Sequence, residues 1–148
     1  MHHLIARLSL ALALSVAALG CGGMEQHGML PDETEATFHR GHSAVGNNGQ
    51  IAITYELDRV LPVRGLNLAT AVVTFADGAT LVDPSVHAHL YMPAHGHGST
   101  EEPIVTPLGN GKYRIENIVC TMAGEWQLTV HAMKDGVDDK ATFILDVP

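Results

Sequence analysis

The chain has 148 residues, enough for one domain with a sizeable core, and this length gives no reason to expect two domains. It carries 8 Lys and Arg against 16 Asp and Glu, a formal net charge of −8. This acidic balance argues against nucleic acid as a partner and against a basic patch that binds a membrane surface.

The first 20 residues have the features of a bacterial export signal. A short basic start that ends at Arg7 leads into an apolar run, residues 8–19, which is too short to span a bilayer. The following Ala18-Leu19-Gly20-Cys21 resembles the lipobox of bacterial lipoproteins, with Ala18 where leucine is usual. We therefore expect residues 1–20 to be a signal peptide and Cys21 to be lipidated. Plain secretory cleavage, with Cys21 lost or left free, is the alternative.

A lipid on Cys21 would anchor the protein to a membrane on the periplasmic side of the cell envelope. Gly22 is not the aspartate often used for inner-membrane retention, so the resemblance implies an outer-membrane anchor if the host is Gram-negative. Loss of Arg7 leaves 7 Lys and Arg against 16 Asp and Glu, or 7 − 16 = −9. Cys120 would then be the only free thiol, so we expect no intrachain disulfide.

Residues 21–49 show no sustained period and end in Gly46-Asn47-Asn48-Gly49, which predicts a flexible tether. The segment holds five side chains that could collect metal, or that a polar tail carries without any such role: Met24, His27, Met29, His39 and His42.

Residues 50–148 form the predicted folded domain, and apolar residues there recur with period two. Seven short strands are expected, separated by turn signals: residues 51–57, 66–75, 86–92, 104–108, 112–119, 125–133 and 140–147. Seven strands in about 100 residues are typical of an immunoglobulin-like β-sandwich. No stretch has a convincing helical period. The prediction is therefore an all-β domain.

Four histidines and one methionine lie close together in residues 87–97. His87 and His89 alternate with apolar residues and so share the strand face opposite the core. Met92, His95 and His97 follow at the strand end and in the next loop. Imidazole suits zinc and copper, and a thioether shifts the preference toward cuprous copper. Met92 could equally be a core residue, and the histidines could be ordinary surface residues.

The geometry of the loop allows these side chains to approach one ion. Gly96 lets the chain bend back between His95 and His97, whereas Pro93 fixes one dihedral and could hold the two pairs of histidines apart. His131 lies on the non-core face of the Trp126 strand and would join the site only if that strand neighbours the His87 strand. We expect Trp126 itself to be a core residue.

Five short motifs resemble the YtkA-like and FixH-like domains of bacterial envelope proteins. In chain order they are Gly65-Leu66-Asn67, Asp77-Gly78, Met92-Pro93-Ala94-His95-Gly96-His97-Gly98, Gly111-Lys112-Tyr113 and Met122-Ala123-Gly124-Glu125-Trp126. The resemblance covers about residues 60–148. It implies a small extracytoplasmic β-sandwich of the kind seen in periplasmic copper carriers, and FixH-like relatives are associated with copper supply to respiratory oxidases.

The resemblance also implies roles for particular residues. Met92 and His97 match the first methionine and the histidine of the family's Met-Pro segment, and Met122 with Trp126 match its Met-x-Gly-x-Trp segment. His95 stands where a second methionine is common. The match therefore does not imply strict cuprous selectivity, because an added imidazole also accommodates cupric copper or zinc.

The sequence predicts a binding protein and not an enzyme. It lacks a Gly-x-Ser-x-Gly elbow, a His-Glu-x-x-His motif and a phosphate-binding glycine loop. The leading hypothesis is an exported, lipid-anchored protein that binds copper, with zinc as the other candidate metal. It would buffer the metal or deliver it to a copper-accepting envelope protein. The alternatives are an envelope protein-interaction module without metal and a small copper enzyme.

Overall fold

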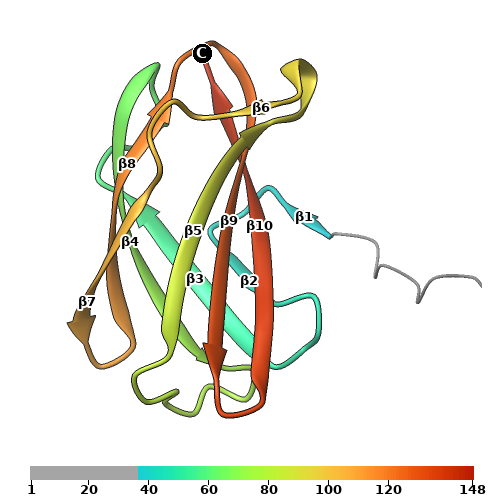
Figure 1. Ribbon diagram of the computed structural model, residues 1–148, viewed down its shortest axis with the longest axis vertical. Helices are drawn as coiled ribbons and strands as arrows, with labels where there is room; N and C mark the ends of the chain where they lie inside the picture. Colours follow the sequence, from blue (N-terminus) through green and yellow to red (C-terminus); the bar gives the residue numbers. More distant parts are fainter. Residues whose placement is uncertain (1–36) are drawn as a thin grey trace, which may run out of the picture. The chain divides into compact units, whose positions relative to one another are not determined.

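The computed structural model describes residues 37–148, which form two five-stranded β-sheets (Figure 1). One sheet has the order β1-β10-β9-β5-β6 and the other the order β2-β3-β4-β8-β7. The elements are β1 Phe38–His39, β2 Ser43–Val45, β3 Ile51–Leu57, β4 Gly65–Phe75, β5 Ser85–Met92, the 3-10 turn η1 Pro93–His95, β6 His97–Gly98, β7 Ile104–Gly109, β8 Lys112–Cys120, β9 Gly124–Lys134 and β10 Val137–Val147. The predicted all-β sandwich is confirmed.

All seven predicted strands are present, as β3, β4, β5, β7, β8, β9 and β10. The described part of the chain adds three strands of two or three residues, β1, β2 and β6. Strands this short show no alternation, so their sequences gave no period to detect.

The first two strands lie where we predicted a flexible tether, and that prediction is wrong for residues 38–49. Strand β1 pairs in parallel with β10, and β2 pairs antiparallel with β3. Arg40, just after β1, pairs with Glu125 on β9 and, at 2.9 Å, with Asp146 on β10. The folded domain therefore includes residues well before 50. The predicted signal peptide, Cys21 and the earlier part of the tether lie outside the described residues.

Asp139 joins the loop after β2 to strand β10. Its carboxylate is 1% exposed and accepts hydrogen bonds from the backbone N–H groups of Asn48, Gln50 and Ile51 at 2.8, 2.8 and 3.2 Å. Gly46 lies directly against this carboxylate, with no room for a side chain. These bonds satisfy buried donors of a loop that would otherwise lack partners.

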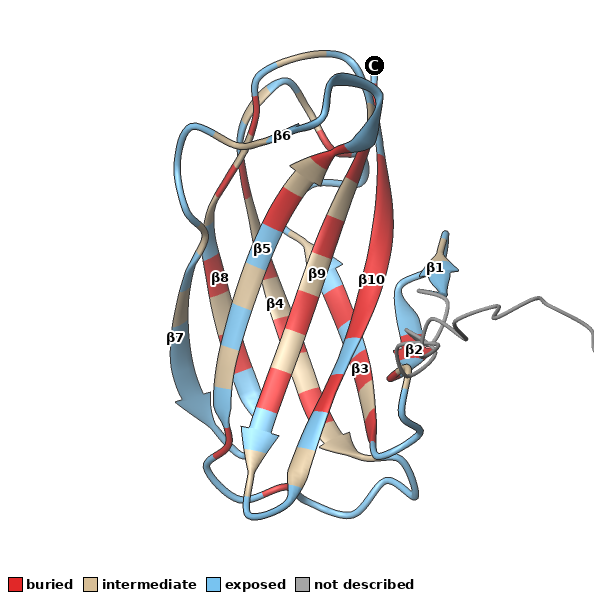
Figure 2. Cartoon of the chain, turned by 45° about the vertical axis from the view of Figure 1, so that its right-hand side comes forward, coloured by how far each residue is buried: buried red, intermediate tan, exposed pale blue. Residues whose placement is uncertain are grey.

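The core is built by the alternation that the sequence predicts. Trp126, Leu128 and Val130 on β9 have no exposed surface, and the residues between them are half-buried (Figure 2). Residues 37–148 enclose this core between their own two sheets, so this part can fold as a unit. No helix in the described part is long and apolar enough to cross a bilayer.

Candidate functional site

Strand β5 carries candidate ligands on both of its faces. His87 and His89 are exposed on the outer face of the β1-β10-β9-β5-β6 sheet, as predicted, whereas Met92 at the strand end is 2% exposed and belongs to the core. Met92 is an odd number of residues from His87 and from His89, so its side chain points the opposite way.

The chain turns back immediately after Met92. Residues Pro93–His95 form η1, and Gly96 follows in the left-handed region with φ 66°. The Gly96 N–H donates to the Met92 carbonyl at 3.0 Å, which closes the turn. His97 then pairs directly opposite Met92 in the β5–β6 ladder. Gly96 thus has the role that the sequence predicts. We name Met92, His95 and His97 the rim site.

Opposite positions of an antiparallel pair share a face, so His97 lies on the same side as Met92. The Met92 side chain packs against Gly124, where an added Cβ would lie 2.9 Å from the Met92 Cε. The His97 ring meets the buried Trp126 edge-on, with ring centroids 6.2 Å apart. Met92 is therefore a core residue and also the nearest cross-strand neighbour of an exposed imidazole.

His97 has a defined tautomer when it is neutral. Its Nδ1 lies 2.8 Å from the Gly98 carbonyl oxygen, which can only accept a hydrogen bond, so Nδ1 carries the proton. The lone pair of Nε2 is then available to a ligand. His95 is exposed in η1, and its ring centroid lies 5.8 Å from that of His97.

Strand β9 neighbours β5, which answers the question of adjacency that the sequence left open. His131 on β9 lies directly opposite His87 and shares its outer face. His131 Nε2 contacts Asp138 Oδ1 at 2.6 Å, and His87 Nε2 contacts Ser85 Oγ at 3.0 Å. We name His87 and His131 the outer-face pair.

His89 lies beside the outer-face pair but makes other contacts. Its Nδ1 is 3.9 Å from a Glu102 carboxylate oxygen, and its ring is stacked with the Tyr91 ring, with centroids 6.5 Å apart. A shallow hollow extends over both strands and is lined by His87, Ala88, His89, Thr129, His131 and Lys140.

The six predicted ligands therefore fall into two groups on opposite faces of β5. Met92, His95 and His97 lie at the rim, whereas His87, His89 and His131 lie on the outer face. Within residues 37–148, no three or more His, Cys, Asp and Glu side chains are arranged to hold one metal ion. A single site that uses all six residues does not fit this arrangement.

Two polar residues of the outer face were missed by sequence reasoning. Ser85 is two residues before His87 on the same strand, so period two could have placed it on the same face. Asp138 reaches His131 across the β9–β10 hairpin, whose turn lies between Lys134 and Val137. The turn signal Asp135-Gly136 could have given that register.

Cys120 is not part of either group. It has no exposed surface, and burial raises the pKa of its thiol to about 12. The prediction that it is a small buried residue is confirmed, since a thiol with this pKa does not supply a thiolate ligand at neutral pH.

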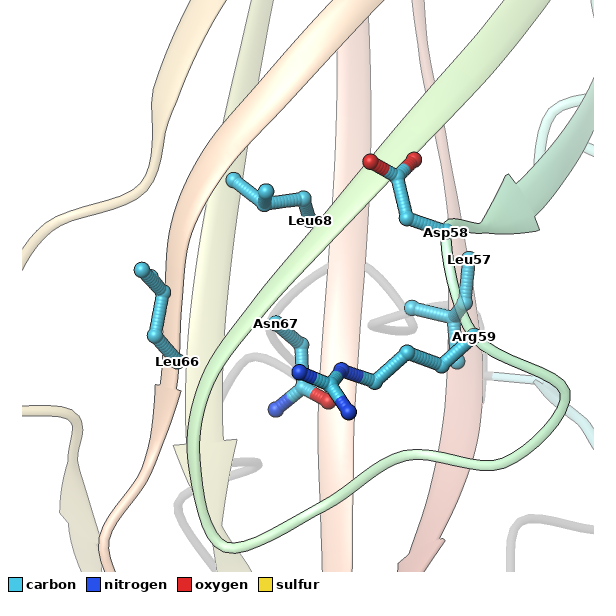
Figure 3. Close-up of a pocket in the computed structure, with 6 residues that line it drawn as sticks. All are labelled: Leu57, Asp58, Arg59, Leu66, Asn67 and Leu68. Carbon is cyan, nitrogen blue, oxygen red and sulfur yellow. The ribbon is translucent and has the colours of Figure 1, made fainter.

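A second hollow lies where β3 ends and β4 begins (Figure 3). Its six lining residues are Leu57, Asp58, Arg59, Leu66, Asn67 and Leu68. The buried Asn67 amide accepts from the Val63 N–H at 2.8 Å and donates to the Val63, Gly65 and Ile118 carbonyls. Asp58 binds Arg114, which lowers the Asp58 pKa through a hydrogen bond. These polar groups are used in holding the turn and the neighbouring strand.

Comparison with known structures supports the fold. The chain is similar to the crystal structure of a DUF4785 family protein from Legionella pneumophila subsp. pneumophila str. Philadelphia 1, with a TM-score of 0.51 and 16% identity. The match covers 66% of this chain but only 28% of that protein, so it bears on the fold alone. No curated protein matches the sequence.

Residues 43–131 match the profile of the YtkA-like family. The match begins in β2, earlier than the resemblance predicted, and ends in β9 before the last strand. It covers the rim site and the outer-face pair. The chain belongs to the YtkA-like family.

Proposed function

We propose that the chain is an exported, lipid-anchored protein of the bacterial cell envelope that binds copper at the rim site. It buffers the metal or passes it to a copper-accepting envelope protein. The predicted leader before Cys21 and membership of the YtkA-like family support the location. The arrangement of Met92, His95 and His97 supports the binding.

The observation that carries the proposal is the tautomer of neutral His97. The Gly98 carbonyl holds the Nδ1 proton, so a neutral His97 presents an unprotonated Nε2. Metal-binding histidines commonly have their second ring nitrogen held in this way, because it fixes the tautomer and the ring orientation. Met92 stands directly opposite in the ladder, and the His95 ring lies next to that of His97.

The chemistry of these donors favours copper. A thioether and neutral imidazoles are ligands that suit cuprous copper, while two imidazoles also accept cupric copper or zinc. Met92 is held by packing, whereas His95 and His97 are exposed and can exchange ligands with a second protein. A thioether fixed by packing, next to imidazoles that a partner protein can reach, suits a protein that releases its metal to that partner.

The experiment is a competitive titration of residues 37–148 with cuprous copper, cupric copper and zinc against chelators of known affinity. The test variant is His95→Ala with His97→Ala, and the matched control is His89→Ala, an exposed histidine of the same strand and loop region. We expect cuprous copper binding that the double variant loses and the control keeps.

A different result would favour the other function. If cuprous and cupric copper both bind more weakly than about 10 μM, the copper proposal fails and a protein-interaction module becomes the better account. The lipid anchor needs a separate test, incorporation of a labelled fatty acid into the full chain in a bacterial host. We expect Cys21→Ser to abolish incorporation, and incorporation into that variant would contradict the proposed anchor.

A further inference from the structure

The outer-face pair has the features of a metal site that is distinct from the rim. His87 and His131 occupy directly opposite positions on β5 and β9, and both line the shallow hollow of the outer face. Cβ atoms in such a pair are about 4.5 to 5.5 Å apart, a separation that lets two imidazoles reach one ion. Strand β9 is paired on both sides at His131, with β5 and with β10, so the backbone holds the spacing of the pair.

Each imidazole of the pair is held through the same ring nitrogen. His131 Nε2 lies 2.6 Å from the Asp138 carboxylate, and His87 Nε2 lies 3.0 Å from the Ser85 hydroxyl. An ionised carboxylate only accepts, so a neutral His131 carries its proton on Nε2 and leaves the Nδ1 lone pair free. A serine hydroxyl can accept a proton from His87 Nε2 in the same way. Oxygen partners of this kind orient metal-binding imidazoles.

We propose that His87 and His131 form a second metal site, for a divalent cation of the zinc class, and that each ligates through Nδ1. Asp138 and Ser85 are positioning residues. The protein supplies two ligands and water completes the coordination, which matches the lack of a group of three or more ligands in residues 37–148. The site is therefore open and exchangeable, with moderate affinity.

The surroundings set the charge at the site. His89, Thr129 and Lys140 line the same hollow. Lys140 lies on β10, directly opposite His131 in the β9–β10 ladder. The Lys140 ammonium opposes a bound cation, whereas the Asp138 carboxylate and the net charge of −8 favour one. His89 faces Glu102 and Tyr91 instead of the pair. The control is His42, an exposed histidine after β1 that does not line the hollow.

This inference does not depend on the proposed function. The rim site lies on the Met92 face of β5 and includes a thioether, whereas the outer-face pair lies on the opposite face and has only imidazoles. Imidazole without a soft thioether suits zinc or cupric copper more than cuprous copper. Failure at one site therefore leaves the other unaffected.

The test is a zinc titration by competition with a chromogenic chelator, made on residues 37–148 carrying His95→Ala and His97→Ala so that the rim site supplies no imidazole. We expect His87→Ala with His131→Ala to weaken zinc binding at least tenfold, and His42→Ala to leave it unchanged. Lys140→Gln should tighten binding by roughly threefold, because an exposed like charge nearby is removed. Cooperative urea unfolding of each variant verifies that it is folded. Zinc binding that survives in the His87, His131 double variant would overturn the proposal, as would no binding at roughly 100 μM zinc.

Long-range 1H–15N spectra of the imidazoles test the ligating atoms directly. We expect zinc to shift Nδ1 of His87 and His131 while Nε2 of both rings stays protonated. Asp138→Ala should weaken zinc binding by roughly tenfold, the usual effect of losing an orienting partner, and Asp138→Asn should restore part of the loss because its amide oxygen accepts the same proton. Zinc on Nε2, or equal affinity in Asp138→Ala, would overturn the assigned roles.

Discussion

Met92 and His97 lie directly opposite each other across the β5–β6 pair, although one side chain is buried in the core and the other is exposed. The turn at Gly96 produces this pairing by bringing the chain back within a few residues. A residue whose thioether is held by the core and a residue with an accessible imidazole are thus cross-strand neighbours at the edge of the sandwich. The binding proposal can be tested most directly at this pair.

Replacing Met92 by leucine separates its role in packing from its role as a ligand. The change keeps the volume, so we expect the free energy of unfolding to fall by less than about 1.5 kcal/mol. The affinity for cuprous copper should fall by roughly tenfold, which corresponds to about 1.4 kcal/mol. Chelator competition and urea unfolding measure the two effects. Met133→Leu on the other face is the control, and equal copper affinity in both variants would exclude Met92 as a ligand.

The single tryptophan reports which site is filled. Trp126 lies next to His97, with ring centroids 6.2 Å apart, whereas the outer-face pair is on the far side of the same sheet. Copper at the rim should quench Trp126 fluorescence, because an ion bound to His97 is close enough for electron or energy transfer from the indole. Zinc at the outer-face pair should change the emission little. Quenching that persists in the His95, His97 double variant would place the copper elsewhere.

Asp139→Asn should destabilise the domain strongly. The buried carboxylate accepts from the N–H groups of Asn48, Gln50 and Ile51, and an amide would turn one acceptor into a donor that faces other donors. We expect a loss of about 2 to 4 kcal/mol in the free energy of unfolding, the cost of leaving buried donors unsatisfied. Asp135→Asn, an exposed position in the β9–β10 turn, should have an effect near zero. Urea denaturation of the two variants gives the comparison, and similar midpoints would show that Asp139 is not required.

The Cys120 thiol should be unreactive in the folded protein. Burial raises its pKa from 9.0 to about 12, so the neutral thiol is the favoured form. The associated stabilisation is complete below pH 9 and is lost as the pH rises toward 12. At pH 8 an alkylating reagent should modify Cys120 only after urea unfolds the chain. Rapid modification of the native domain would contradict the burial of this thiol.

Much of the fold could be predicted from the sequence because alternation is a local signal. Buried apolar residues such as Leu128 and Val130 occupy every second position of their strand, and turn residues mark the ends of the long strands. Strands β1 and β2 could not be found in this way. Strand β1 pairs with β10, which is far away in the sequence, and β2 pairs with β3 across a loop. Neither strand is long enough to show a period.

The candidate sites were predictable only in part, for the same physical reason. The rim depends on a local hairpin, so Gly96 between two histidines was an adequate signal. The outer-face pair depends on the contact of β5 with β9, two strands separated by β6, β7 and β8 in the chain. Period two placed His87 and His131 on non-core faces but could not place their strands side by side.

The alternation along β5 has a consequence for how the chain tolerates insertions. Moving the pairing of this strand by one residue would turn His87 and His89 into the core and Val86 and Leu90 toward water. One inserted or deleted residue inside β5 would therefore disrupt both proposed metal sites at once. The same change between Val82 and Asp83, two exposed residues of the loop before Ser85, would alter neither. The number of residues in β5, more than the identity of any single ligand, therefore limits how the sequence at these two surfaces can change.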